Sequence, residues 1–280
     1  PCAGPNRFVS EGLQNLLIAF GDHLQTQYAG RLFFHFAREV LAITPGQGGL
    51  GLRAKILNGQ GEENEAFRYG IVTASVNVIQ NIAFNPPLNA EVTIPLQYLR
   101  LGSYKKIALH VQQLPPAILA NTQYTLNTLV ADVAGGNVVW QYWRWQLQPT
   151  ILMVTVTGSQ AAELDALENA AVVTMAVNAL SNAYPQQGNW TVLRSGVTNW
   201  SDATFVQGAF SCTLPATDLG ANNPTAYNAR PTLRGTVQGT CVLFAGEATD
   251  TDAYGTLSGS FAQGVAAARR IIAAAGGPIV

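Results

Sequence analysis

The stretch Cys241-Val-Leu-Phe-Ala-Gly-Glu-Ala-Thr249, followed by Tyr254-Gly-Thr-Leu-Ser-Gly-Ser-Phe-Ala-Gln-Gly-Val-Ala-Ala-Ala-Arg269, decides the fold of this chain. The apolar run that breaks at Gly246-Glu247 predicts a buried strand with a carboxylate at its end, and the alanine-rich segment after Gly259 predicts a helix. Small residues in the first turn of that helix would let a flat or anionic ligand approach its free N–H groups and the positive end of its dipole. The pattern therefore predicts a ligand-binding strand-to-helix junction.

This segment resembles the C-terminal signature of the flavin-containing amine oxidases, the family of the monoamine and polyamine oxidases. By that resemblance, Gly246 and Glu247 belong to the cofactor site, where Glu247 would hydrogen-bond the ribityl or phosphate part of FAD. Gly255, Thr256 and Leu257 would face the pyrimidine edge of the flavin ring, where a helix N-terminus stabilises negative charge. The residues taken alone also allow a strand and a helix that pack closely through small residues.

Further segments match the family in the same order along the chain. Residues 68–80 and 84–88 resemble the strand and turn that lead to the substrate domain. Tyr104-Lys-Lys-Ile-Ala-Leu-His110 resembles the polyamine oxidase strand with the active-site lysine, which assigns that catalytic role to Lys106. The resemblance extends from about Phe8 to the C-terminus, and several weak motifs in the correct order are stronger than any one of them.

The tandem lysines predict opposite orientations for their side chains. Successive residues of a strand point to opposite faces, so one of Lys105 and Lys106 faces the interior, and the resemblance selects Lys106. Lys106 would hold a water near flavin N5 and promote the reaction with oxygen electrostatically. The alternative for Lys106 is an ordinary solvent-facing lysine.

Aromatic residues supply the predicted substrate site. Thr198-Asn-Trp-Ser201 and Gly208-Ala-Phe-Ser211 resemble the flavin-adjacent tryptophan and the aromatic substrate wall, so Trp200 would contact both flavin and substrate and Phe210 would contact substrate. An ordinary core role is the alternative. Thr256 stands where many members have a second tyrosine around the substrate, and Tyr104 or Tyr254 would compensate.

Two further cofactor features follow from the resemblance. Val40 falls where the family contacts adenine through its backbone. Ala209 aligns with the cysteine through which monoamine oxidases bind flavin covalently, so FAD should be noncovalent.

The dinucleotide-binding unit of the family is missing near the start of this chain. Gly46-Gln-Gly-Gly-Leu-Gly51 spells the glycine pattern, but it precedes residues 52–57, which read as a strand rather than a helix. We therefore expect a loose turn between strands at that place. The chain would then be the C-terminal part of a larger flavoenzyme, with a second polypeptide carrying Gly-x-Gly-x-x-Gly.

The expected fold class is α/β, or mixed α+β. Residues 1–95 and 199–280 would form parts of a Rossmann-like FAD-binding domain, and residues 96–198 would form a substrate domain of sheet and covering helix. The predicted elements are a helix near residues 8–17, strands at 32–43, 51–57, 70–78, 107–111, 138–145 and 151–157, and helices at 159–183 and after 259. Residues 218–231 are expected to form a loop.

Composition excludes several functional classes. The formal net charge is -1 and only 11% of residues are charged, which gives no reason to expect nucleic acid or an anionic membrane surface as partner. The 3 cysteines have no metal-like spacing, so no metal site is expected. No apolar run approaches the ~20 residues that cross a bilayer, so we expect a soluble chain. A signal peptide for secretion would have belonged to the missing N-terminal portion.

The resemblance implies oxidation of a primary or secondary amine to an imine, with O2 reduced to H2O2. The motifs favour a polyamine, whereas the scarcity of acidic residues between Val92 and Ala162 favours an amino acid or a simple amine. One alternative is an L-amino-acid oxidase matured by cleavage of a precursor. An alternative of another class is a catalytically silent scaffold with the flavin-binding fold.

Overall fold

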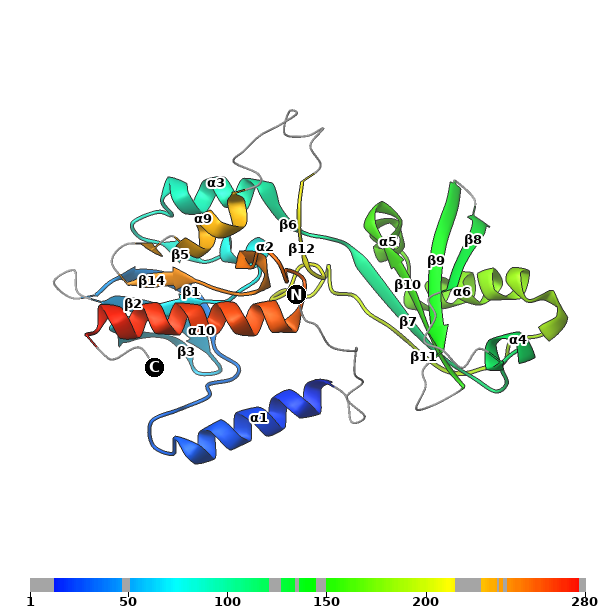
Figure 1. The fold of residues 1–280 in the computed structure, drawn as a ribbon, viewed down its shortest axis with the longest axis horizontal. Coiled ribbons are helices and arrows are strands. Elements are labelled where there is room, and N and C mark those ends of the chain that lie inside the picture. Colours follow the sequence, from blue (N-terminus) through cyan, green and yellow to red (C-terminus); the bar gives the residue numbers. More distant parts are fainter. Residues whose placement is uncertain are drawn as a thin grey trace. The chain divides into compact units, whose positions relative to one another are not determined.

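The computed structural model of the chain describes residues 13–46, 51–120, 127–133, 136–144, 150–214, 228–235, 237–238 and 241–276. The chain divides into two compact units (Figure 1). Unit 1 comprises Pro1–Gly70, Ile82–Leu88 and Val237–Val242, and unit 2 comprises Ile71–Asn81, Asn89–Thr236 and Leu243–Val280. The three-part division expected from the sequence stays a prediction.

Unit 1 is built on a four-stranded sheet with the strand order β3-β2-β1-β5. Strand β2 pairs with β1 and β3 in antiparallel fashion, and β5 pairs with β1 in parallel fashion. Alternate residues of β2 are buried, as expected for a sheet with one covered face. The elements of unit 1 are α1 (Leu13–Gln27), β1 (Glu39–Pro45), β2 (Leu52–Asn58), β3 (Gly61–Phe67), β5 (Ala83–Phe84) and β13 (Val237–Gln238).

The glycine run lies between two antiparallel strands. Gly46 donates its N–H to the Gly51 carbonyl at 3.1 Å, and a strand, β2, follows the run at once, as the sequence predicts. Gly51 has a φ of +71°, and a Cβ there would lie 2.3 Å from the Phe67 carbonyl oxygen. Conformation and close approach both require glycine at that position. Residues 47–50 lie outside the described residues.

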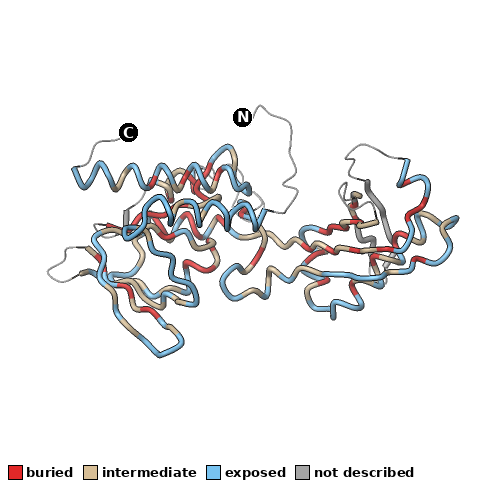
Figure 2. The backbone as a smooth tube through the Cα atoms, turned by 90° about the horizontal axis from the view of Figure 1, so that it is seen from below, coloured by how far each residue is buried: buried red, intermediate tan, exposed pale blue. Residues whose placement is uncertain are grey.

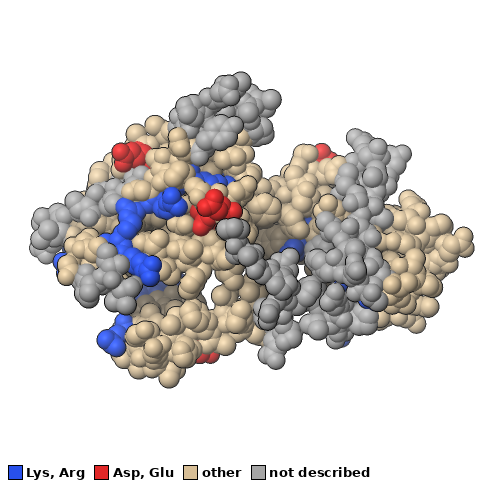
Figure 3. Space-filling model, in the orientation of Figure 1, with Lys and Arg blue, Asp and Glu red and all other residues tan. Residues whose placement is uncertain are grey.

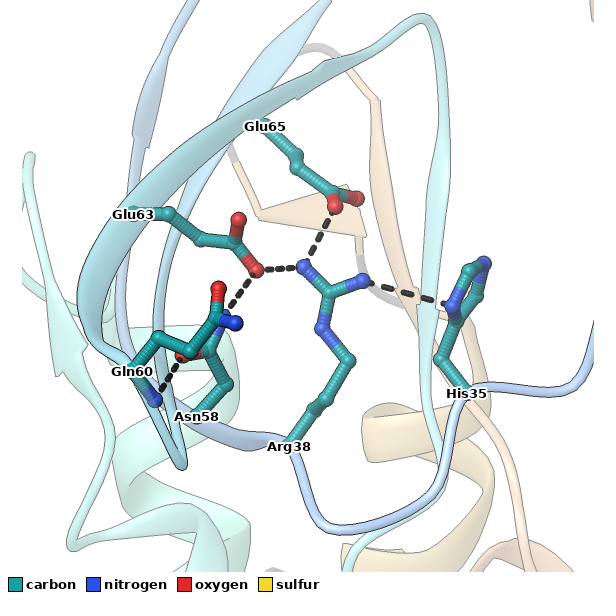
Figure 4. Close-up of polar contacts among 6 residues, drawn as sticks. All are labelled: His35, Arg38, Asn58, Gln60, Glu63 and Glu65. Atoms are coloured by element: carbon teal, nitrogen blue, oxygen red, sulfur yellow. Dashed lines mark hydrogen bonds and ion pairs between the residues drawn. The ribbon is translucent and has the colours of Figure 1, made fainter.

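An ionic cluster ties the segment before β1 to β3 (Figure 4). The Arg38 guanidinium pairs with Glu63 and, at 2.5 Å, with Glu65, and it lies 3.3 Å from Nδ1 of His35. Asn58 donates to the same Glu63 carboxylate at 2.8 Å. Arg38 therefore has a structural role in unit 1.

Unit 2 contains a five-stranded antiparallel sheet with the order β11-β7-β10-β9-β8. Helices α5 and α6 pack against it (Figure 1). Their apolar side chains form one buried core with those of the strands, and Figure 2 colours the buried residues of the backbone red. These elements are β7 (Tyr104–Val111), α4 (Pro116–Leu119), β8 (Asn127–Val133), β9 (Gly136–Arg144), β10 (Ile151–Thr157), α5 (Gly158–Asp165), α6 (Asn169–Ala183), η2 (Pro185–Gln187) and β11 (Val192–Val197).

The rest of unit 2 gathers short elements around the start of α10. Helix α3 contacts α9, and the 3-10 helix η3 contacts α9, α10 and β12. These elements are α2 (Val76–Ile79), α3 (Ala90–Tyr98), β6 (Leu99–Leu101), β12 (Ser211–Thr213), α9 (Ala229–Gly235), η3 (Glu247–Thr249) and α10 (Leu257–Ala274). Strands β4 (Gly70–Val72) and β14 (Val242–Phe244) pair in a sheet with the order β13-β14-β4, and the unit boundary runs through both.

Several elements differ from the sequence-based expectation. The predicted strand over residues 70–78 is β4 followed by α2, where the Val78 and Ile79 N–H groups donate to the Ser75 carbonyl in a helical turn. The single helix predicted over 159–183 is two helices, since Glu168 is extended, with a ψ of 141°. Helix α1 runs well past residue 17, and the strand expected over 32–43 begins only at Glu39. Part of the loop expected over 218–231 is the start of α9, while residues 215–227 lie outside the described residues.

Within the described ranges, no helix combines the length and apolarity needed to cross a membrane. The same residues contain no group of three or more His, Cys, Asp or Glu side chains that could hold a metal ion. Charged side chains are sparse on the face seen in Figure 3.

Candidate active site

Four of the predicted site residues lie together in unit 2. The Tyr104 ring centroid is 6.0 Å from that of Trp200 and 5.9 Å from that of Phe210. The Lys106 ammonium nitrogen lies 5.7 Å from the Tyr104 centroid and 5.6 Å from the Trp200 centroid. Three aromatic rings and one cation therefore form a single cluster, which we call the aromatic–lysine cluster.

Strand alternation and two backbone connections produce this cluster. Tyr104 and Lys106 are two residues apart in β7 and so share a face. The segment after β11 is tied to β7, because Thr198 donates its N–H to the Lys106 carbonyl at 3.0 Å and its hydroxyl accepts the Lys106 N–H at 2.9 Å. Phe210 returns to the same place because its carbonyl accepts the Gly102 N–H at 2.9 Å.

The two lysines do point to opposite faces, but the expectation that Lys106 faces the interior is wrong. Lys105 is the buried one, at 0% exposure, and its ammonium lies 2.7 Å from Asp165. The register of β7 explains this, because residues 105, 107, 109 and 111 all point toward the core beneath α5 and α6. Lys106 is partly buried on the other face, against the aromatic rings.

The start of α10 lies against the cluster. Thr256 caps the helix, since its hydroxyl accepts the Gly259 N–H at 3.0 Å. Gly255 has a φ of +69°, and a Cβ on it would lie 3.4 Å from the Phe210 ring. Leu257 is exposed, at 47%. The first N–H groups of a helix have no partner within the helix, so this end presents amides beside Phe210.

Glu247 holds the turn that precedes α10. Its carboxylate accepts the Ser211 N–H at 2.9 Å, the Ser211 hydroxyl at 2.7 Å and the Gly255 N–H at 2.7 Å. Gly246, with a φ of +128°, places Glu247 at the end of the apolar strand, as the sequence predicts. Glu247 thus connects β12, next to Phe210, with the turn at Gly255. Its contact with FAD stays a prediction.

Arg230 was missed by sequence analysis. It is buried at 6% exposure and donates to the Ser211 hydroxyl at 2.6 Å, the Ser211 carbonyl at 3.1 Å and the Ala248 carbonyl at 3.1 Å. Burial lowers the pKa of Arg230, while the charge of Glu247 opposes that shift. Its position in a segment expected to be a loop gave no signal of burial.

Tyr254 contacts this arginine rather than the three clustered rings. The Arg230 guanidinium lies 4.1 Å from the centroid of the Tyr254 ring. Of the two tyrosines expected to compensate for Thr256, Tyr104 is therefore the one that joins the aromatic–lysine cluster.

Val40 belongs to unit 1, whereas the other predicted site residues belong to unit 2. It lies in β1, is 37% exposed and pairs with Ile56 of β2. Its backbone contact with adenine stays a prediction.

The comparisons with known proteins agree with this architecture. The mouse (Mus musculus) lysine-specific histone demethylase 1B is 25% identical over 205 residues, which are 72% of this chain and 24% of that protein. Among solved structures, a triple mutant of a putrescine oxidase, made in a redesign of cofactor binding, matches with a TM-score of 0.67 and 16% identity. The match covers 94% of this chain and 53% of that chain. That similarity confirms the expected mixed α/β amine oxidase fold. The chain thus spans about a quarter of the length of the demethylase and about half of the length of the putrescine oxidase.

The family model described as flavin containing amine oxidoreductase matches residues 2–272. This match covers nearly the whole chain and includes every residue of the aromatic–lysine cluster and the start of α10. The chain belongs to the flavin-containing amine oxidoreductase family.

Proposed function

We propose that this chain supplies the substrate site of an enzyme that oxidises a primary or secondary amine to an imine. The carbon–nitrogen unit loses two electrons and two protons, O2 takes up the same number to become H2O2, and water hydrolyses the imine. Bound FAD carries the electrons between the two half-reactions. The observation that supports this proposal is the Lys106 ammonium against the Tyr104 and Trp200 rings, beside the start of α10.

Membership of the family makes FAD the cofactor, and the residues at the start of α10 fit it. Gly255 has no side chain toward Phe210, and the first-turn amides and the dipole favour a planar group with negative charge at its edge. Thr256 and Leu257 would face that edge through their backbone. Ala209 has no nucleophile, so acid precipitation should release the flavin into the supernatant. Flavin that remains in the pellet would contradict noncovalent binding.

The aromatic rings would bind and orient the amine. The faces of Tyr104, Trp200 and Phe210 attract cationic groups and exclude water, which holds the substrate carbon in place for oxidation. Lys106 would act in the second half-reaction, because a fixed positive charge stabilises the negative charge that develops on oxygen during reduction. The N-terminus of α10 would stabilise negative charge at the pyrimidine edge.

A second polypeptide segment with a Gly-x-Gly-x-x-Gly turn would complete the FAD site. The glycine run at residues 46–51 leads into β2, so it lacks the helix N-terminus that binds a pyrophosphate. Apolar side chains are also exposed along two helices: Leu13, Leu16, Leu17 and Phe20 of α1, and Leu257, Phe261, Val265 and Ile272 of α10. Figure 2 shows α10, the helix that leads to the C-terminus, as mostly exposed. Such faces are typical of surfaces that another segment covers.

The partner proposal predicts that this chain alone is poorly soluble or colourless. Coexpression with a segment that contains the glycine turn should give a soluble yellow complex. A stable 280-residue monomer with one FAD bound would contradict it.

The substrate class is tested by an oxygen electrode with polyamines, simple amines and L-amino acids. Lys105 faces the core and is paired with Asp165, so it adds no positive charge that would attract a substrate carboxylate. Oxygen uptake with amines is expected. Uptake only with L-amino acids would identify an amino-acid oxidase, and no uptake by the flavin-loaded protein would identify a silent scaffold.

A further inference from the structure

A buried ion pair lies directly behind the aromatic–lysine cluster. The Lys105 ammonium is 2.7 Å from the Asp165 carboxylate and donates to the Asn199 side-chain carbonyl at 3.0 Å. The Asn199 amide in turn donates to the Asn169 side chain at 3.3 Å. Lys105 itself has no solvent exposure. These four side chains form one chain of contacts, which we call the Lys105 network.

The network joins separate elements of unit 2. Lys105 belongs to β7, Asp165 ends α5, Asn169 begins α6, and Asn199 follows β11. One ammonium group therefore connects the sheet, its covering helices and the segment that enters the active site.

Stability alone does not account for this arrangement. Removing both charges from water is costly, and a buried ion pair can often be replaced by apolar residues with little loss of stability, whereas removal of one partner is strongly destabilising. The strand and helix that carry the ion pair also contribute Ile107 and Leu164 to the buried apolar core. Apolar side chains in place of Lys105 and Asp165 would be accommodated there. What an apolar pair cannot supply is the hydrogen bond to Asn199.

That hydrogen bond fixes the residue before Trp200. Thr198 donates its N–H to the Lys106 carbonyl and accepts the Lys106 N–H at its hydroxyl. The side-chain carbonyl of Asn199 accepts a hydrogen bond from the Lys105 ammonium. The two residues that precede Trp200 are thus tied to the two lysines of β7. These hydrogen bonds fix the backbone that carries Trp200, and its indole ring lies against Tyr104 and Lys106.

We propose that Lys105, Asp165 and Asn199 are positioning residues that hold Trp200 in the aromatic–lysine cluster. Lys105 and Lys106 then have complementary roles, since one orients the ring and the other lies against it. The consequence for catalysis rests on the proposed function, but the positioning of Trp200 does not.

The direct test measures near-UV circular dichroism of the full chain. The contribution of Trp200 is the signal of a given protein minus the signal of the same protein with Trp200→Phe. Asn199→Ala leaves the ion pair in place and should abolish most of this difference signal. The matched control is Asn189→Ala, because Asn189 is also exposed and followed by a tryptophan but lies outside the Lys105 network. A difference signal that survives Asn199→Ala would overturn the proposal.

The ion pair is tested by the double variant Lys105→Met/Asp165→Leu. Lys105→Met alone should lower the denaturant midpoint, and the double variant should recover most of that loss while still lacking the Trp200 signal. Recovery of both stability and signal would overturn the positioning role. If the double variant fails to fold, Asn199→Ala decides the question by itself.

In the flavin-loaded protein, Asn199→Ala should raise KM for the amine ~3- to 10-fold and should have no further effect in a Trp200→Phe background. Additive effects in that background would contradict action through Trp200. If the protein oxidises no amine, the proposed function fails, and the dichroism still tests the positioning of Trp200.

Discussion

The Lys106 ammonium nitrogen lies 5.6 Å from the centre of the Trp200 ring. A cation over an indole is attracted by about 0.5–1 kcal/mol at an exposed site and by more where water is excluded. The contact holds the lysine beside the aromatic rings without neutralising its charge. Its neighbour Lys105 is instead paired with a carboxylate. The positive charge of Lys106 therefore remains available to a reaction at the site.

The first prediction concerns this charge. Lys106→Met should slow reoxidation of reduced flavin by oxygen by about ten- to a hundredfold, because a fixed charge that stabilises a developing anion is lost. FAD binding should change little, and Lys106→Arg should retain much of the rate. Stopped-flow absorbance measures it. The control is Lys55→Met, which removes a surface lysine paired with Glu62; equal slowing in both variants would show that Lys106 has no special role.

A second prediction concerns the aromatic wall. Phe210→Leu should raise KM for a cationic amine by about two- to fivefold, which corresponds to the loss of one ring–cation contact. Steady-state oxygen uptake measures the change. Phe205→Leu serves as the control, because Phe205 is 62% exposed in the preceding loop. An unchanged KM in the Phe210 variant would place the substrate elsewhere.

The third prediction concerns Glu247. Glu247→Gln replaces one acceptor oxygen by an NH2 group, so at least one of the donors from Ser211 and Gly255 loses its partner. Unfolding free energy should fall by about 1–3 kcal/mol. Urea titration measures it, with the exposed Glu163→Gln as control. Equal stability of the two variants would show that the three contacts of Glu247 are not important for folding.

Acid stability should depend on Asp250. Hydrogen bonds from the Ala253 backbone and the Gln263 side chain lower the pKa of Asp250, against the opposing effect of burial. Because the folded pKa is below the unfolded value of about 4, the stabilisation is complete above that value and is lost as pH falls through the folded pKa. Asp250→Asn should be less stable at pH 7 and should lose less stability on acidification. Urea midpoints measured from pH 7 to pH 3 test this, and parallel slopes would exclude Asp250 as a source of acid sensitivity.

The sequence predicted the parts of the site that depend on local periodicity. Strand alternation correctly separates Lys105 from Lys106, and the apolar run before Gly246 correctly ends at Glu247. Alternation could not say which lysine faces the core, because that depends on where α5 and α6 pack. Arg230 and the choice of Tyr104 over Tyr254 depend on contacts between distant segments, which no local pattern contains. For the same reason the break at Glu168 was missed within an otherwise helical composition.

The most direct measurement mixes the FAD-loaded protein with amines under anaerobic conditions and follows the absorbance of oxidised flavin. We expect an amine to bleach it, and we expect oxygen to restore it with one H2O2 formed per amine consumed. Bleaching that is slowed by Phe210→Leu, together with reoxidation that is slowed by Lys106→Met, would assign both half-reactions to the aromatic–lysine cluster. A protein that binds FAD but stays oxidised with every amine and amino acid in the panel would contradict the account.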